Sequence, residues 1–215
     1  MPTTTVFGWT TPADTDLVKD GASAIRTLAS GIDTTVAVRQ PTLIPVESTY
    51  YVSVGHTSQS TSVTQTKQQT YYLPIYLPSA TFDRLSFRTN ANHSGTIPTR
   101  LGIYANSTSN KPSTLILDAG TVSATATNTT YEITINQTLT NGWYWLAING
   151  QSASGTMANN GWTNGLVTQS SFLASTATTA NSSSFYTQTG VTGAFANAGT
   201  LVSVGSAPDI RIRIA

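Results

Sequence analysis

The chain has 215 residues, no cysteine, a formal net charge of +1 and only 9% charged residues. The absence of cysteine excludes disulfides and thiolate chemistry, and the small net charge gives no electrostatic basis for binding nucleic acid or an anionic membrane. Ser and Thr make up close to a third of the chain, which also has nine Tyr and four Trp, so the composition favours a Thr-rich β-sheet protein over a disordered one.

The N-terminus, "MPTTTVFGWTTPAD", is polar and has neither a basic region nor an apolar stretch. We therefore expect no signal peptide and synthesis in the cytoplasm. No apolar run approaches the roughly 18 residues of a membrane-spanning helix, so no membrane insertion is expected. Residues 1–13 are predicted to be extended, and Pro12 followed by Asp14 or Thr15 indicates the start of a helix.

A narrow apolar stripe follows this helix start. Its members are Val18, Gly21, Ile25, Leu28 and Ile32. Their spacing of three and four residues is that of heptad a and d positions, which predicts a helix with a seam for self-association. The alternative is a helix that packs on its own β-domain. Two or three heptads are too short to hold an oligomer alone, so other parts of the chain must contribute.

Residues 37–48 contain Pro41 and Pro45, which predict an extended spacer. The predicted organisation therefore has three parts. Residues 1–36 form an arm and helix for attachment and oligomerisation, residues 37–48 form a linker, and residues 49–215 form a β-domain.

Apolar alternation of period two predicts strands throughout the third part. The predicted strands are 49–54, 70–77, 81–89, 99–105, 131–135, 142–148 and 209–214. Pro74 and Pro78 indicate that 70–77 is an edge or bulged strand, whereas "GWYWLAI" at 142–148 has large residues on both faces, as a central strand does. Residues 151–200 are predicted to be long loops joining two or three strands. The predicted fold is mainly β, with an N-terminal arm and single helix followed by an antiparallel, jelly-roll-like β-sandwich.

Titratable groups that would support catalysis are few. His56 and His93 lie in polar, loop-like stretches and are predicted to be solvated, without the clustered ligands of a metal site. A glycosidase needs only two carboxylates, so the sequence alone does not exclude one. Each acidic residue of the β-domain nevertheless has an ordinary explanation at a turn or on an outward strand face. We therefore predict that the chain is not an enzyme and holds no cofactor or metal.

Aromatic side chains on a sheet face offer a different chemistry, because sugars stack on them. The residues considered for surface ligand contacts are Tyr50, Tyr51, Tyr71, Tyr72 and Trp162, with Tyr76, Trp143 and Trp145 as further candidates. The alternative for each is core packing, which is favoured for Trp143 and Trp145.

Two segments resemble a known family. Residues 7–36, "FGWTTPADTDLVKDGASAIRTLASGIDTTV", resemble the N-terminal segment of many tailed-bacteriophage virion proteins, among them tail-fibre, minor-tail and head-fibre proteins. The recurring form is Gly-Trp, a Pro-containing turn, Asp-x-Val-x-Asp-Gly, "AIRTL" and an Ile-Asp ending. The matching residues here are Gly8, Trp9, Pro12, Asp16, Val18, Asp20, Gly21, 24–28, Ile32 and Asp33. Residues 99–148 resemble a jelly-roll-like β-domain that recurs at the C-terminal ends of phage fibres and structural proteins.

The resemblance implies a virion protein made in the bacterial host cytoplasm, commonly a homotrimer, with its N-terminal segment on a tail or capsid protein and its β-domain displayed. It supplies no catalytic residues. We therefore expect a fibre or spike subunit, with binding of a host-surface glycan as an open alternative. The competing functions are a capsid decoration or cement protein without a receptor role and, less expected, a glycan-degrading tail enzyme.

Phe7 and Trp9 are the expected contacts of the arm with the particle, because aromatic residues in a polar arm commonly act as interface hot spots. The alternative is that Trp9 packs back on the helix as a hydrophobic staple.

Overall fold

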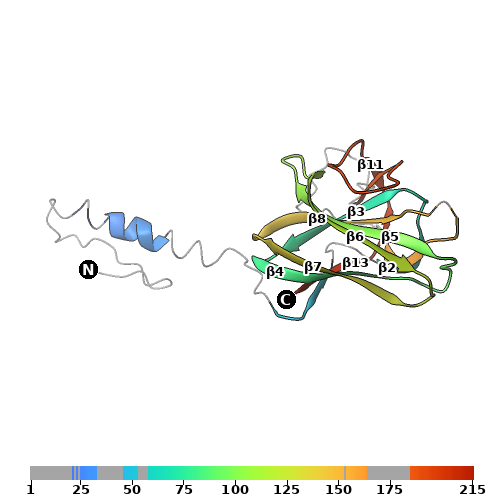
Figure 1. The fold of residues 1–215 in the computed structure, drawn as a ribbon. Coiled ribbons are helices and arrows are strands. Elements are labelled where there is room, and N and C mark those ends of the chain that lie inside the picture. The colour runs from blue at the N-terminus through green and yellow to red at the C-terminus, as the bar shows by residue number, and fades with distance from the viewer. Residues whose placement is uncertain are drawn as a thin grey trace. The chain divides into compact units, whose positions relative to one another are not determined.

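A computed structural model describes residues 21, 23, 25–32, 46–52, 58–152, 154–163 and 185–215 (Figure 1). The chain divides into two compact units, Met1–Ile44 and Pro45–Ala215, which are considered separately below.

In the first unit, residues 21, 23 and 25–32 are helical. Ile25 and Ile32 are exposed, at 63% and 37%, and Leu28 is partly exposed. The three residues are spaced by three and four, so they share one side of the helix. Of the other two predicted seam residues, Gly21 is helical and half-buried, whereas Val18 lies outside the described residues, as do Phe7, Trp9 and most of the predicted linker. The oligomeric seam stays a prediction. No helix among the described residues is long and apolar enough to cross a bilayer.

The second unit is built of antiparallel strands. They are β1 Tyr50–Val52, β2 Ser58–Thr64, β3 Thr70–Leu77, β4 Ala80–Arg88, β5 Ile97–Asn106, β6 Pro112–Ala124, β7 Thr130–Leu139, β8 Gly142–Gly150, β9 Ala158–Thr163, β10 Phe185–Gln188, β11 Val202–Val204, β12 Ser206–Pro208 and β13 Ile210–Ile214.

Eight of these strands form a jelly roll. One sheet has the order β1-β13-β4-β7, and the other contains β3-β8-β5-β6 and is extended at its β3 edge by β10 and β11. Chain-successive strands of this set pass from one sheet to the other, except for the β5–β6 hairpin. This order of eight strands in two sheets is the double Greek key of a jelly roll, so the predicted mainly-β, antiparallel sandwich is confirmed.

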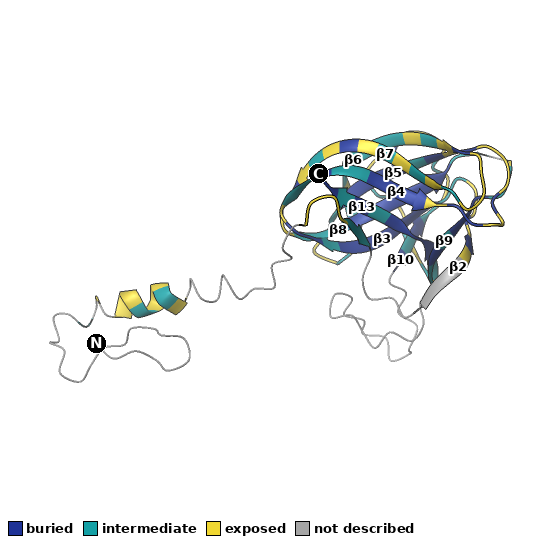
Figure 2. Ribbon diagram, turned by 90° about the horizontal axis from the view of Figure 1, so that it is seen from below, coloured by how far each residue is buried: buried dark blue, intermediate teal, exposed yellow. Residues whose placement is uncertain are grey.

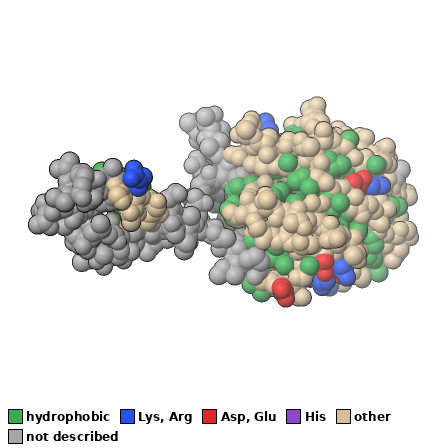
Figure 3. Space-filling model, turned by 60° about the vertical axis from the view of Figure 1, so that its left-hand side comes forward, with side chains coloured by type: hydrophobic (Ala, Val, Ile, Leu, Met, Phe, Trp, Pro, Cys, Tyr) green, Lys and Arg blue, Asp and Glu red, His purple; other side chains and the backbone are tan. Residues whose placement is uncertain are grey.

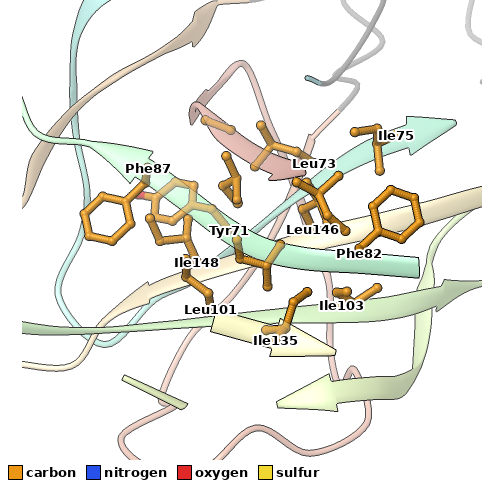
Figure 4. Packing of buried hydrophobic residues seen from close by; sticks show 14 of the residues in the cluster. Tyr71, Leu73, Ile75, Phe82, Phe87, Leu101, Ile103, Ile135, Leu146 and Ile148 are labelled. Atoms are coloured by element: carbon orange, nitrogen blue, oxygen red, sulfur yellow. The ribbon is translucent and has the colours of Figure 1, made fainter. Parts of the chain in front are cut away.

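The main core lies between the two sheets (Figure 4). Large apolar side chains from both sheets meet there. Figure 4 shows Leu73, Phe82, Phe87, Leu101, Ile103, Leu146 and Ile148 directed into one layer. In β13 the isoleucines Ile210, Ile212 and Ile214 are buried, whereas Arg211 and Arg213 are partly exposed, as the alternation predicted. Figure 2 shows this burial concentrated in the middle of the strands, with exposed residues at loops and on β7.

The strand of residues 70–77 is less peripheral than its prolines suggested. All eight residues of β3 pair with β8 without a register shift. At the other edge of β3, the residues that pair with β10 are Thr70, Tyr71 and Tyr72. Pro74 lies beyond the last of these pairs. The missing proline N–H therefore costs no ladder hydrogen bond with β10.

The segment between β8 and β13 is an insertion relative to the eight-strand frame. Its strand β9 pairs with β2 and β12 in a third, three-stranded sheet, and its strands β10 and β11 join the six-stranded sheet. Residues 189–201, between β10 and β11, form what we call the cap segment. This insertion creates the site described next.

Candidate functional site

The face of the six-stranded sheet that points away from the main core, here called the outer face, is aromatic. Because neighbouring residues of a strand point to opposite faces, Tyr71 faces the main core and Tyr72 faces outward. Tyr104 and Trp145 share this outer face and are nearly inaccessible, at 1% and 0% exposure. A sheet with one solvated face would not carry such residues, so this face requires a cover.

The cap segment supplies the cover. Its Phe195 packs in the same cluster as Tyr72, Tyr104 and Trp145, with ring centroids of Phe195 and Tyr104 5.9 Å apart. Tyr72 and Tyr104 meet edge to face at 5.1 Å and 87°. Gly102 allows this packing, because a Cβ there would lie 2.7 Å from the Phe195 ring.

Polar contacts fix the cap segment to the sheet at several points. The Phe195 N–H donates to Asp118 Oδ2 at 3.1 Å, and Arg100 Nη1 donates to both carboxylate oxygens of Asp118 at 2.7 Å. Asn149 Nδ2 donates to the Val191 carbonyl at 3.0 Å. The cap segment is therefore held by side chains of β5, β6 and β8.

A pocket of about 280 Å³ lies where the cap segment meets the outer face. It is lined by Tyr72, Tyr104, Gln188, Gly190, Val191, Thr192, Gly193, Ala194 and Ala196. The two tyrosines are buried, whereas Thr192, Gly193 and Ala194 are exposed. The pocket thus has a buried aromatic floor and an accessible rim of small residues.

Hydrogen bonds orient the polar groups of this pocket. Gln188 Oε1 accepts from the Tyr72 hydroxyl at 3.1 Å and from the Gly199 N–H at 2.8 Å. This network assigns the Gln188 oxygen and leaves its Nε2 without a hydrogen-bond partner among the described residues. The Tyr104 hydroxyl donates to the Ala196 carbonyl at 2.9 Å.

The phenols of the pocket stay protonated over a wide pH range. Burial raises the pKa of Tyr72 to about 12. Burial also raises the pKa of Tyr104, and the nearby Tyr72 and Asp118 raise it further. None of the described residues that line the pocket carries a charge at neutral pH, so this lining is polar but neutral.

Several charged groups of the second unit are paired on the four-stranded sheet or beside it. Arg213 donates to both oxygens of Asp83, Arg211 donates to Asp209, and Arg84 lies near Asp83 and Glu132. Figure 3 shows one face of the protein on which charges are few and acidic groups lie beside basic ones. Among the residues that the structure describes, no group of three or more His, Asp or Glu side chains is placed to hold a metal ion.

The five aromatic residues predicted as surface ligand contacts do not come together. Tyr50 is half-buried, its hydroxyl bonds to Glu132 Oε1, and the Arg213 guanidinium lies 5.7 Å from its ring centroid. Tyr51 and Trp162 are half-buried against the main core, and the Trp162 Nε1–H donates to Asp209 Oδ1 at 3.0 Å.

The surface position predicted for Tyr71 and Tyr72 is wrong. They are 6% and 1% exposed, because both faces of this sheet are covered, one by the other sheet and one by the cap segment. Tyr72 is one of the residues that line the pocket. Trp145 is fully buried, as the core-packing alternative predicted, whereas Trp143 is half-buried and packs edge to face with Tyr76.

The solvated position predicted for His93 is also wrong, since its side chain is 4% exposed. The turn that follows β4 folds inward, with the His93 N–H donating to the Asn90 carbonyl and the ring Nε2 3.3 Å from the Ala124 carbonyl oxygen. His56 lies outside the described residues.

Sequence reasoning missed Tyr104, Gln188 and the cap segment. The alternation in "TRLGIYA" does place Tyr104 opposite Leu101 and Ile103, and this was the available signal. No comparable pattern marks "VTGAFANAGT", apart from a single Phe in a stretch of small residues.

No protein-family model matches the chain, and no curated protein sequence is significantly similar to it.

Proposed function

We propose that this chain is a structural protein of a tailed-bacteriophage virion, a fibre or spike subunit. Residues 1–36 attach it to the particle and assemble copies of it, and the jelly-roll unit is the displayed part. The likeness of residues 7–36 and 99–148 to segments of phage virion proteins is the sequence basis of this proposal.

The observation that carries the proposal is the jelly-roll order of the eight strands in Pro45–Ala215. Viral structural proteins and lectins use this architecture repeatedly, because closely packed antiparallel sheets tolerate large changes in their loops. Since one fold serves many functions, the likeness of architecture supports the class of protein, and the pocket beneath the cap segment must supply the specificity.

The first unit fits an assembly role. Ile25 and Ile32 are large apolar residues exposed on one side of the described helix. A helix of a soluble protein usually buries such a stripe, and a second copy of the same stripe provides a matching partner. This supports a homo-oligomer, for which we propose three copies.

Incorporation into particles tests this function. The parent phage, lacking its own copy of the gene, is complemented with the full chain, with Trp9→Ala or with Thr4→Ala as the matched control, and the protein in purified particles is measured by quantitative mass spectrometry. We expect normal incorporation of the full chain and the control, and loss of the Trp9→Ala protein despite normal soluble oligomer. If the Trp9→Ala protein is fully incorporated, and deletion of the second unit abolishes incorporation, then the jelly-roll unit attaches the protein to the particle and the proposed orientation is reversed.

The same measurement separates this function from a decoration protein. A few copies to a few tens of copies per particle support a fibre or spike, whereas hundreds of copies support capsid cement without a receptor role. Absence of the wild-type protein from particles would overturn the virion assignment.

A further inference from the structure

We propose that the pocket beneath the cap segment binds a single uncharged sugar ring. That a host cell surface supplies the sugar rests on the proposed function, whereas the chemistry of the pocket stands on its own geometry.

The size of the pocket sets the first limit. Its volume of about 280 Å³ is near the lower end of the range for small-molecule sites, roughly 300–1,000 Å³. It is therefore suited to one ring of a glycan, with the rest of the chain outside the rim. The exposed rim residues Thr192, Gly193 and Ala194 have small side chains, so they leave the entrance open.

The absence of charge in the lining sets the second limit. Asp118, which accepts from the Phe195 N–H of the cap segment, is neutralised by Arg100 through two contacts of 2.7 Å. An anionic ligand such as a uronic acid or a phosphate would lose its hydration without gaining a cation, which is costly. A ligand for this pocket is therefore neutral.

The free hydrogen-bonding groups set the third limit. Gln188 Nε2 is a donor without a partner among the described residues, and the Tyr104 oxygen retains acceptor capacity after donating to Ala196. Thr192 adds a hydroxyl at the rim. A purely apolar ligand would leave these groups desolvated and unpaired, whereas a sugar hydroxyl both donates and accepts.

The aromatic floor completes the match. Tyr72 and Tyr104 meet edge to face beneath the pocket, and each presents to it only the small part of its ring and hydroxyl that the packing leaves uncovered. A sugar ring likewise combines an apolar C–H face with a polar edge, so both parts of the ligand find a partner.

Saturation-transfer difference NMR on the full chain tests this inference. The probes are D-glucose, D-galactose and N-acetyl-D-glucosamine, with D-glucuronate as the charged counterpart of glucose. We expect a transfer signal for at least one neutral sugar, with a dissociation constant in the millimolar range typical of so small a ligand, and no signal for glucuronate.

Two variants locate the binding. Gly193→Leu adds bulk at the rim, where a Cβ meets nothing within 4 Å, and Gly205→Leu is the matched control at an equally open position outside the pocket lining. Gln188→Glu keeps an acceptor for Tyr72 and Gly199 but replaces the free donor. We expect about tenfold weaker sugar binding for Gln188→Glu, the loss expected when a desolvated hydrogen bond is removed. We expect a loss of about the same size for Gly193→Leu, because its side chain narrows the entrance, and wild-type binding for Gly205→Leu.

The thermal unfolding midpoint of each variant shows whether it is folded, and Gly193→Leu alone decides the matter if Gln188→Glu unfolds. The inference is overturned if no neutral sugar gives a signal, if glucuronate binds as well as glucose, or if Gly193→Leu binds like the control. Because particle incorporation is measured without sugar, a protein that binds no sugar but enters particles refutes the pocket alone. A protein that binds sugar but is absent from particles refutes the virion function alone.

Discussion

Asp118 is the residue whose replacement should most clearly loosen the cap segment. Its carboxylate accepts from Arg100 Nη1 and from the N–H groups of Gly120 and Phe195. Asn at position 118 keeps the shape but loses the charge, and its NH₂ group must face one of these donors. Arg100 then loses its carboxylate partner, while its Nε is already buried without a partner among the described residues.

The cost of Asp118→Asn follows from these contacts. A hydrogen bond to a charged group contributes about 1.5–3 kcal/mol, and breaking a fully buried ion pair costs about 3–5 kcal/mol. The Arg100 and Asp118 side chains are 17% and 22% exposed, so solvent screening reduces the larger figure. We expect the free energy of unfolding to fall by about 2–3 kcal/mol.

Urea unfolding followed by tryptophan fluorescence, at one fixed protein concentration, measures this change. Glu47→Gln is the control, because Glu47 is exposed and forms no ion pair within the described residues, and its effect should stay within about 0.5 kcal/mol. A loss below about 0.5 kcal/mol for Asp118→Asn would refute the view that Asp118 anchors the cap segment.

The pH dependence gives an independent check. Burial alone would raise the pKa of Asp118, but the hydrogen bonds from Arg100, Gly120 and Phe195 outweigh it and hold this pKa below its usual value. The unfolded chain therefore binds the proton first, so the contribution of Asp118 is complete above about pH 5 and is lost as the pH falls through the folded pKa, below about 3.9. The stability difference between wild type and Asp118→Asn should shrink over that window, and a constant difference down to pH 2 would contradict this assignment.

Three further predictions concern assembly, independence and packing. Ile25→Asp should convert a trimer into monomers in size-exclusion chromatography with light scattering, because it places a charge in each copy of the seam, whereas Arg26→Asp should leave the trimer intact; a monomeric wild type at micromolar concentration would refute the seam. Residues 45–215 alone should unfold cooperatively, since they contain both apolar clusters, and a transition without cooperativity would show that the first unit is required. Gly102→Ala should lower the free energy of unfolding by about 1–3 kcal/mol, and with it the thermal midpoint, because its Cβ would lie 2.7 Å from the Phe195 ring and 2.8 Å from the Leu117 carbonyl oxygen. An unchanged midpoint would mean that the cap segment shifts freely.

Strands with strong alternation were predictable from the sequence. All seven predicted strands are present, including the central β8 and the alternating β13. Strand β2, "SQSTSVT", was missed because its one apolar residue gives no period. Strand β6 was missed because it is a partly exposed edge strand whose residues do not alternate regularly between buried and exposed. Its irregularity shows in the register shifts against β5 and in the positive φ of Gly120.

The pocket was not predictable, because its parts meet only in the folded chain. The hydrogen bond from Tyr104 to Ala196 joins residues 92 positions apart, and that from Tyr72 to Gln188 joins residues 116 apart. Adjacent tyrosines at 71 and 72 are readily placed on opposite faces by alternation. Alternation does not reveal that a later segment covers the second face, and for that reason Tyr72 was expected at the surface.

Electron cryomicroscopy of the parent-phage particle would show which part of the chain touches the particle. We expect three copies around each attachment point, with residues 1–36 against a tail or capsid protein and the jelly-roll unit projecting into solvent with the pocket accessible. A map in which the jelly-roll unit lies against the particle and residues 1–36 project outward, or in which no density fits this chain, would refute the proposed virion role.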